Sequence, residues 1–232
     1  MSPPRVVSLV PSVTETLLAW GVEPVGVTRF CEQPRFEAVG GTKDPHVARI
    51  VELAPDIVVV DKEENRREDA DALVAAGCAL HVVHVTSVDD VAPTLDGLRA
   101  ALDLPPHAHH ALPAPRPIDT TAFVPIWRRP WMAIGGDTYG ASLLRLLGIC
   151  PVPDVGERYP TVDDLGAVGA DVVLAPSEPY PFAERHRAEL EQVAPVTFVD
   201  GKDLFWWGIR TSDATMARLS EPGHRSGRAG EG

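Results

Sequence analysis

Two pairs of segments repeat the same order of helix and strand signals, and this repeat restricts the fold more than any other feature of the sequence. LLAWGVEPV at 17–25 is echoed by LRLLGICPV at 144–152, each a helix end followed by G-x-x-P-V. VELAPDIVVVD at 51–61 is echoed by GAVGADVVLAP at 166–176, each a helix end, then Asp, then an apolar run. Short apolar runs between amphipathic stretches are typical of parallel strands buried on both faces. The sequence therefore predicts two α/β lobes in tandem.

The predicted lobes are joined by a segment of different composition. We expect an N-terminal α/β lobe at 1–88, an interlobe helix and Pro-rich linker at 89–116, and a C-terminal α/β lobe at 117–220. Five prolines between 105 and 117 exclude a long continuous helix there, so the connecting helix is short. The tail at 221–232 is rich in Gly and Arg, which predicts disorder.

Polar residues just after the predicted strands indicate where the helices begin. The predicted helix caps are Ser12, Asp44, Asn65 and Asp137. Ser12 and Asn65 each precede a Glu by three residues, the spacing of a capping box, and Asp44 precedes a Pro at the first helical position.

Aromatic residues recur in the loops that follow the predicted strands. Ligands of open α/β sheets bind outside the carboxyl ends of the strands, and two such edges are expected to face each other across a cleft. Any one of these rings could belong to the core, but their convergence on strand ends favours a ligand site. The candidate ligand-binding residues are Phe30, Glu63, Glu64, Asn65, Trp127, Trp131, Tyr139, Tyr180, Phe205, Trp206, Trp207 and Arg210.

Composition excludes several classes of partner. The formal net charge of −12 and the absence of a Lys/Arg cluster argue against a nucleic acid. No apolar run approaches the roughly 20 residues of a membrane-spanning helix. The N-terminus has no apolar run of signal-peptide length, which predicts a cytoplasmic location for the chain as written.

Signatures of catalysis or of a resident metal are not found. The sequence contains no GxSxG and no HExxH, and its three Cys residues are far apart with no CxxC. His107, His109 and His110 lie in the Pro-rich linker, where a flexible solvated segment is favoured over the alternative of incidental metal affinity. The sequence predicts a binding protein without catalytic residues, metal ligands or a cofactor of its own.

Several long segments of the sequence resemble a known family. RVVSLVPSVTETLLAWGVEPVGVTRFCEQP at 5–34 and GGTKDPHVARIVELAPDIVVVDKEENR at 40–66 are similar to the substrate-binding proteins of bacterial ABC importers that take cobalamin, haem or ferric siderophores, also called helical backbone metal receptors. The similarity continues more loosely through IWRRPWMAIGGDTYGASLLRLLG, SEPYPF and FWWGIRT. It implies two Rossmann-like lobes with parallel sheets and a ligand in the cleft between them.

The resemblance also implies roles for particular residues. The family's aromatic position after the second strand falls on Phe30, and its late aromatic and arginine segment falls on Trp206, Trp207 and Arg210. In the family an acidic residue on each lobe pairs with arginines of the transporter, and the candidates here are Glu68, Glu184 and Glu189. The family normally carries a secretion signal or lipid anchor and normally joins its lobes by one long helix, and neither feature is expected from this sequence.

Three hypotheses follow from these observations. The first is a monomeric, non-catalytic receptor for a planar metal chelate, cobalamin or another corrinoid before haem or a ferric siderophore, that delivers its ligand to an ABC transporter permease. The second is a cytoplasmic enzyme on the same tandem fold, such as a chelatase or a corrinoid-modifying protein. The third is a copy that has lost its ligand, in which Trp127, Trp131, Trp206 and Trp207 would be packed inside.

Overall fold

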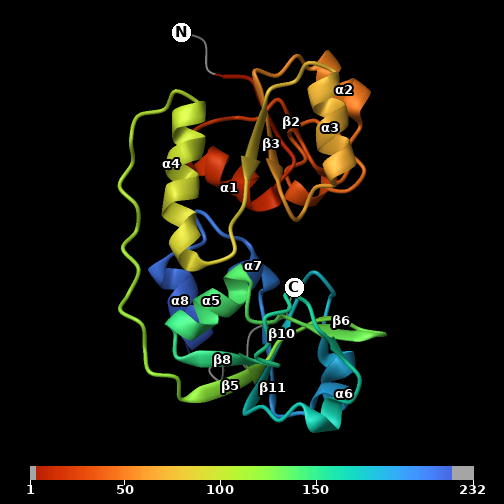
Figure 1. Cartoon of the computed structure of the whole chain (residues 1–232), viewed down its shortest axis with the longest axis vertical. Coiled ribbons are helices and arrows are strands. Elements are labelled where there is room, and N and C mark those ends of the chain that lie inside the picture. Colours follow the sequence, from red (N-terminus) through yellow and green to blue (C-terminus); the bar gives the residue numbers. More distant parts are fainter. Residues whose placement is uncertain (1–3, 221–232) are drawn as a thin grey trace, which may run out of the picture. The chain divides into compact units, whose positions relative to one another are not determined.

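The computed structural model describes residues 4–220, which form two compact units (Figure 1). The first unit consists of the chain up to Val85, Asp89–His109 and the short segment Trp207–Ile209. The second consists of Thr86–Val88, His110–Trp206 and, among the described residues, 210–220. The tail expected at 221–232 lies outside the described residues.

The first unit is built on a parallel sheet with the strand order β2-β1-β3-β4. Its strands are β1 (Val6–Ser8), β2 (Gly26–Val27), β3 (Ile57–Asp61) and β4 (Leu80–Val83). Its helices are α1 (Pro11–Ala19), α2 (Val47–Glu52), α3 (Arg67–Ala75) and α4 (Val91–Ala101), with 3-10 turns at Arg29–Cys31 and Val88–Asp90.

Both faces of this first sheet are covered, as its continuous apolar strands require. Alternate residues of β1 and β3, such as Val7 and Val58, pack with Ile50 of α2 and Leu73 of α3 in one buried cluster. Helices α2 and α3 lie side by side over this face (Figure 1). The opposite face contacts α1 through β1 and α4 through β4.

The second unit contains a parallel sheet and a smaller antiparallel one. The parallel sheet has the order β11-β10-β5-β8 and the antiparallel sheet has the order β6-β7-β9. The strands are β5 (Thr120–Phe123), β6 (Pro125–Trp127), β7 (Trp131–Ala133), β8 (Ile149–Val152), β9 (Thr161–Val162), β10 (Val172–Pro176) and β11 (Val196–Val199). The helices are α5 (Tyr139–Leu146), α6 (Arg187–Leu190), α7 (Gly201–Phe205) and α8 (Asp213–Ser220), with 3-10 turns at Leu165–Ala167 and Glu184–His186.

One face of the second parallel sheet packs on the smaller sheet and on α6. Phe123 of β5 and Val173 of β10 share a buried cluster with Ala133 of β7 and Leu190 of α6. Leu174 of β10 lies on the alternate face of the strand and is fully buried.

The sequence repeat is confirmed as a repeat of topology. Read from β8, the second parallel sheet has the order β8-β5-β10-β11, which matches β2-β1-β3-β4 in the first unit strand for strand. The glycines of the two G-x-x-P-V echoes, Gly21 and Gly148, both have positive φ angles, of 76° and 86°, directly after α1 and α5. A residue with a side chain is strained in this conformation, so both glycines end their helices in the same way. The predicted α/β class with parallel sheets is thus confirmed.

The caps predicted for the first two helices, Ser12 and Asp44, are wrong. The helix predicted to start after Ser12 starts at Pro11, with Val10 as its cap residue, so Ser12 lies inside the first turn. Asp44 does not cap α2, which begins after His46; its carboxylate instead pairs with Arg29 at 2.9 Å. A β-bridge between Gly40 and Pro45 keeps the chain extended here and delays the helix.

The other two predicted caps are also wrong. Asn65 does not cap α3, whose cap residue is Arg66, and no side chain bonds to the start of that helix. Thr138 caps α5 in place of Asp137, since its hydroxyl accepts a hydrogen bond from the amide of Ala141 at 3.2 Å. Asp137 pairs with Arg158 at 3.2 Å.

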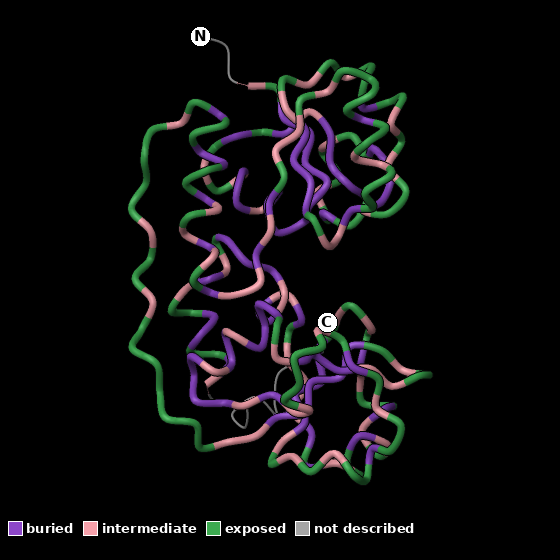
Figure 2. Tube along the Cα trace, viewed as in Figure 1, coloured by how far each residue is buried: buried purple, intermediate pink, exposed green. Residues whose placement is uncertain are grey.

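Along the chain, the short helix α4 and the Pro-rich segment after it lie between β4 and β5. Helix α4 has 11 residues, and the chain at 105–119 that follows it has no helix or strand and is mostly exposed, whereas the strands are mostly buried (Figure 2). Between residues 4 and 220, no helix has both the length and the apolar character needed to span a bilayer.

Candidate ligand-binding site

In the first unit, the loop after β3 is held in place by a buried asparagine. The Asn65 Oδ1 accepts a hydrogen bond from the amide of Asp61 at 2.7 Å. Its Nδ2 donates to the carbonyl oxygens of Leu9 at 3.3 Å and Thr42 at 2.8 Å. One side chain therefore ties the end of β3 to the end of β1 and to the 40–45 loop.

The same loop displays the two predicted glutamates on a carboxylate-capped turn. The Oδ1 of Asp61, which is buried at the end of β3, accepts hydrogen bonds from the amides of Glu63 at 2.7 Å and Glu64 at 3.1 Å. Both glutamate side chains are half-buried, and Oε1 of Glu63 lies 3.5 Å from Nδ1 of His84, just beyond β4. The ends of β3 and β4 thus place a carboxylate and an imidazole together.

Phe30 is the exposed aromatic residue at the end of β2. Half of its surface (51%) is accessible, and the Arg29 guanidinium lies over its ring at 5.0 Å. A large apolar side chain that remains this exposed at a strand end is available to a ligand.

In the second unit, an aromatic cluster follows β10. The rings of Tyr180 and Phe182 lie 4.7 Å apart, Trp131 stacks on Phe182 at 5.9 Å with an interplanar angle of 8°, and Trp127 meets Tyr180 edge-on at 5.6 Å. Phe182 is buried in the core, whereas Trp127 is 47% exposed. The cluster therefore runs from the core to the surface and ends in an accessible indole.

His186 closes the buried side of this cluster. Its ring lies 5.5 Å from that of Tyr180, and its Nδ1 accepts a hydrogen bond from the amide of Ala183 at 3.1 Å. Burial lowers the pKa of His186, and the nearby Arg185 and Arg128 lower it further. The folded protein thus favours the neutral imidazole.

This lowered pKa predicts that acid destabilises the second unit. Since histidine in an unfolded chain titrates near pH 6.5, the stability contributed by neutral His186 is fully present above about pH 6.5 and is lost as the pH falls below it. Urea unfolding at pH 7.5 and pH 5 should show this loss in the wild type and a smaller loss in His186→Asn, whose Oδ1 can accept the same hydrogen bond. An equal loss in both proteins would contradict this assignment.

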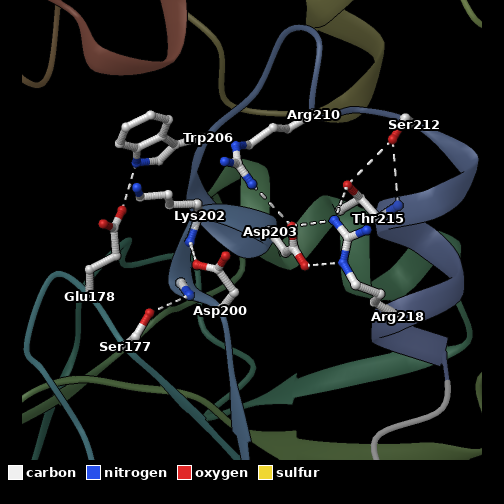
Figure 3. Close-up of polar contacts among 11 residues, drawn as sticks. Ser177, Glu178, Asp200, Lys202, Asp203, Trp206, Arg210, Ser212, Thr215 and Arg218 are labelled. Carbon is white, nitrogen blue, oxygen red and sulfur yellow. Dashed lines mark hydrogen bonds and ion pairs between the residues drawn. The ribbon is translucent and has the colours of Figure 1, made fainter. Parts of the chain in front are cut away.

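The segment FWWGIR at 205–210 places one indole among charged side chains. The Nε1 of Trp206 donates a hydrogen bond to Oε1 of Glu178 at 2.6 Å (Figure 3). The Lys202 ammonium lies 4.8 Å from the centre of the Trp206 ring, and the Arg210 guanidinium lies 5.5 Å from it. Trp206 is buried, so this indole orients two cations at the end of β11.

The remaining predicted aromatic residues are less accessible. Trp207 is buried and belongs to the first unit, whereas its neighbour Trp206 belongs to the second, and Phe205 is half-buried. Tyr139 is buried at the start of α5; its hydroxyl is 2.9 Å from Oγ1 of Thr211, and burial raises its pKa to about 12. Because these side chains are buried or half-buried, they are better placed to hold the loop in position than to contact a ligand.

The three acidic residues considered for docking differ in their exposure. Glu68 is 70% exposed and lies 3.6 Å from Arg66, and Glu184 is 73% exposed and paired with Arg187 at 2.5 Å. Glu189 is 33% exposed and accepts a hydrogen bond from Arg128 at 2.8 Å. Glu68 and Glu184 therefore present carboxylates at the surface, while Glu189 is engaged beside the aromatic cluster.

Several residues of these loops were not predicted from the sequence. Glu178 is bonded to Trp206, and Asp203 pairs with both Arg210 and Arg218, as the dashed lines in Figure 3 show. The Lys202 ammonium lies near the Trp206 ring. The spacing of Lys202 and Trp206, four residues apart and so on one side of a helical turn, was the available signal. Among residues 4–220, no three His, Cys, Asp or Glu side chains are grouped as a metal site.

Comparison with known proteins identifies the fold. The chain is similar to solved structures titled a periplasmic heme-binding protein from Pseudomonas aeruginosa and the periplasmic vitamin B12-binding protein of Vibrio cholerae. The first has a TM-score of 0.76 and 19% identity over 98% of this chain and 95% of that chain. The second has a TM-score of 0.69 and 15% identity over 95% and 96%, respectively. The chain has the periplasmic binding-protein fold.

Sequence similarity relates one part of this chain to curated relatives. It is 32% identical over 112 residues to vitamin B12-binding proteins of Salmonella choleraesuis and Salmonella typhimurium, and 32% identical over 113 residues to that of Yersinia pestis. These matches cover 46–47% of the chain and 40–42% of each relative. The chain therefore spans about two fifths of the length of the curated relatives it matches. No family model matches the sequence. The names of these relatives and structures describe binding proteins and not enzymes.

Proposed function

We propose that this protein is a non-catalytic receptor for a planar metal chelate, with cobalamin or another corrinoid as the first candidate and haem or a ferric siderophore next. The observation that carries the proposal is the 32% identity to vitamin B12-binding proteins over 112 residues, in a chain whose fold covers 96% of a solved vitamin B12-binding protein. Solved heme-binding proteins of the same fold support the wider class of flat chelates. No relative or structure reported above favours the enzyme hypothesis.

The accessible residues at the strand ends are the proposed ligand contacts. Phe30 and Trp127 present exposed rings, and an aromatic face on a flat macrocycle contributes about 1 kcal/mol beyond the area buried. Glu63 and Glu64 present half-buried carboxylates, and Lys202 and Arg210 present cations oriented by Trp206. Rings and charges of both signs suit a chelate with an apolar face and a polar edge.

A titration with three chelates tests the proposal. Cyanocobalamin, hemin and a ferric siderophore are added separately to the full chain, and tryptophan fluorescence and the visible spectrum of the ligand are followed. At least one is expected to bind with a Kd below roughly 100 μM, equivalent to about −5.5 kcal/mol. Trp127→Ala should weaken that binding, whereas Trp20→Phe, at the other end of α1 from the strand-end loops, should not. If all three chelates fail to bind, the proposal is wrong.

The proposal extends to a transporter partner. A receptor of this kind would deliver its chelate to an ABC transporter permease, and the exposed carboxylates of Glu68 and Glu184 are the proposed docking points. A solved structure with this fold, from Listeria monocytogenes, is titled an ABC transporter substrate-binding protein. The monomeric state and the cytoplasmic location expected from the sequence stay predictions, which sedimentation and cell fractionation test.

A further inference from the structure

A carboxylate and an imidazole meet where β3 and β4 of the first unit end. Oε1 of Glu63 lies 3.5 Å from Nδ1 of His84, and the two side chains are 28% and 36% exposed, respectively. The Nδ1 atom itself is buried and makes no hydrogen bond with any residue of the described range 4–220. The carboxylate favours a proton on Nδ1, because it attracts an N–H group and repels a nitrogen lone pair.

The other ring nitrogen of His84 is then left with the lone pair. Nε2 bonds to no described residue and, unlike Nδ1, is not a buried atom, so it reaches the surface. A histidine that ligates a metal commonly donates its second ring N–H to a carboxylate, which fixes both the tautomer and the orientation of the ring. The Glu63–His84 pair has these parts, and it lies at the carboxyl ends of parallel strands, where ligands of such sheets bind.

The pair suits a metal that is already chelated better than a free ion. Two side chains are too few ligands for a free ion, and within the described part of the chain no three His, Cys, Asp or Glu residues come together. A macrocycle already fills the equatorial positions of its metal, so one protein ligand on an open axial position is enough. Imidazole nitrogen is a common protein ligand for iron and its neighbours among the transition metals.

We propose that Nε2 of His84 is an axial ligand to the metal of the bound chelate and that Glu63 is the positioning residue that holds the imidazole for it. The Nε2 lone pair forms one coordinate bond as the water on the metal leaves, without a change of oxidation state. The inference rests on the proposed function and deepens it: the preferred ligands are haem or a corrinoid with an exchangeable axial position, and not a siderophore that surrounds its iron.

Two forms of one chelate that differ only at the axial position test the inference. Aquocobalamin carries an exchangeable water on cobalt, whereas cyanide occupies that position in cyanocobalamin. The wild type should bind aquocobalamin about tenfold more tightly, the lower end of what the loss of a supporting group costs a metal site. The visible spectrum of the bound aquocobalamin should become that of an imidazole complex. Hemin with and without saturating cyanide makes the same comparison for haem.

Variants of the pair separate coordination from a structural role. His84→Ala should bind both forms equally and lose the imidazole spectrum, and added free imidazole should restore that spectrum. Glu63→Leu should lose most of the preference for aquocobalamin, whereas Glu63→Gln, which keeps an acceptor oxygen, should retain more of it. His81→Gln removes the other imidazole of β4 and should change neither the preference nor the spectrum. Equal binding of both forms by the wild type, with no imidazole spectrum, would overturn the inference.

The tautomer of His84 is measured without any ligand, by nitrogen NMR of its ring. In the neutral imidazole we expect the proton on Nδ1 in the wild type, and on Nε2 in Glu63→Leu, since free histidine prefers the Nε2–H form. If the wild type binds none of the chelates, the proposed function is wrong. If it binds them but the neutral His84 carries its proton on Nε2, coordination by His84 is wrong while the proposed function stands.

Discussion

Asn65→Ala is expected to destabilise the first unit by about 3 kcal/mol, because one substitution leaves three main-chain groups without their partner. The amide of Asp61 and the carbonyl oxygens of Leu9 and Thr42 would each lose a hydrogen bond from a side chain that is 9% exposed. Asn65 is the only asparagine in the chain. Urea unfolding measures the loss, and hydrogen exchange should show that the Asp61 amide becomes less protected.

Glu68→Ala is the matched control for this prediction. If Asn65 and Glu68 formed the capping box that their spacing suggests, both substitutions would cost about 1 kcal/mol, the usual value of a lost cap. In the structure Glu68 is an exposed residue with an ion-pair contact to Arg66 at 3.6 Å, so its loss should cost less than about 0.5 kcal/mol. Similar small losses in both variants would show that the capping box forms after all.

The sequence predicted the architecture well because its strongest signals are repeated. Each apolar run at 57–60 and 172–175 became the third strand of its sheet in topological order, and each glycine of the G-x-x-P-V echoes ended a helix. The antiparallel sheet β6-β7-β9 was not predicted. Its strands have only two or three residues, and Thr161–Val162 pairs with residues about 30 positions earlier, which no local pattern encodes.

The helix caps failed for a common physical reason. Ser, Asp and Asn side chains bond to whichever main-chain or charged group the tertiary structure brings near, and sequence spacing reports only the local alternative. Asp44 pairs with Arg29, 15 residues away in the sequence, and Asn65 donates a hydrogen bond to the carbonyl oxygen of Leu9, 56 residues away. The residues predicted to begin two helices instead hold loops at the strand ends.

For the candidate site too, the sequence predicted features that depend on neighbouring residues but not those that depend on tertiary packing. The sequence indicated which loops carry aromatic residues, but exposure depends on packing, which separated Trp127 at 47% from Trp206 at 8%. The adjacent Trp206 and Trp207 even belong to different units. Asp203 and Arg218 could not be paired from the sequence, because they lie 15 positions apart on two separate helices.

Gly201→Ala is expected to disrupt the loop that carries Trp206. Helix α7 starts against the strand-end segment after β10, where the amide of Gly201 donates to the hydroxyl of Ser177 at 3.0 Å. A Cβ at position 201 would lie 2.7 Å from both the amide nitrogen and the carbonyl oxygen of Glu178, closer than side chains approach main-chain atoms. Overpacking of this kind costs about 1–3 kcal/mol and must move α7 away from Glu178.

The same displacement should separate Trp206 from Glu178 and so reach the proposed site. Since the Nε1 of Trp206 is bonded to that carboxylate at 2.6 Å, Gly201→Ala should shift the tryptophan emission and weaken chelate binding by about tenfold or more, as one misplaced contact can. Gly156→Ala is the control in the same unit, because a Cβ there meets no atom within 4 Å. It should leave binding unchanged and stability equal or slightly higher. Wild-type stability and emission in Gly201→Ala would show that α7 does not pack on Glu178 in solution.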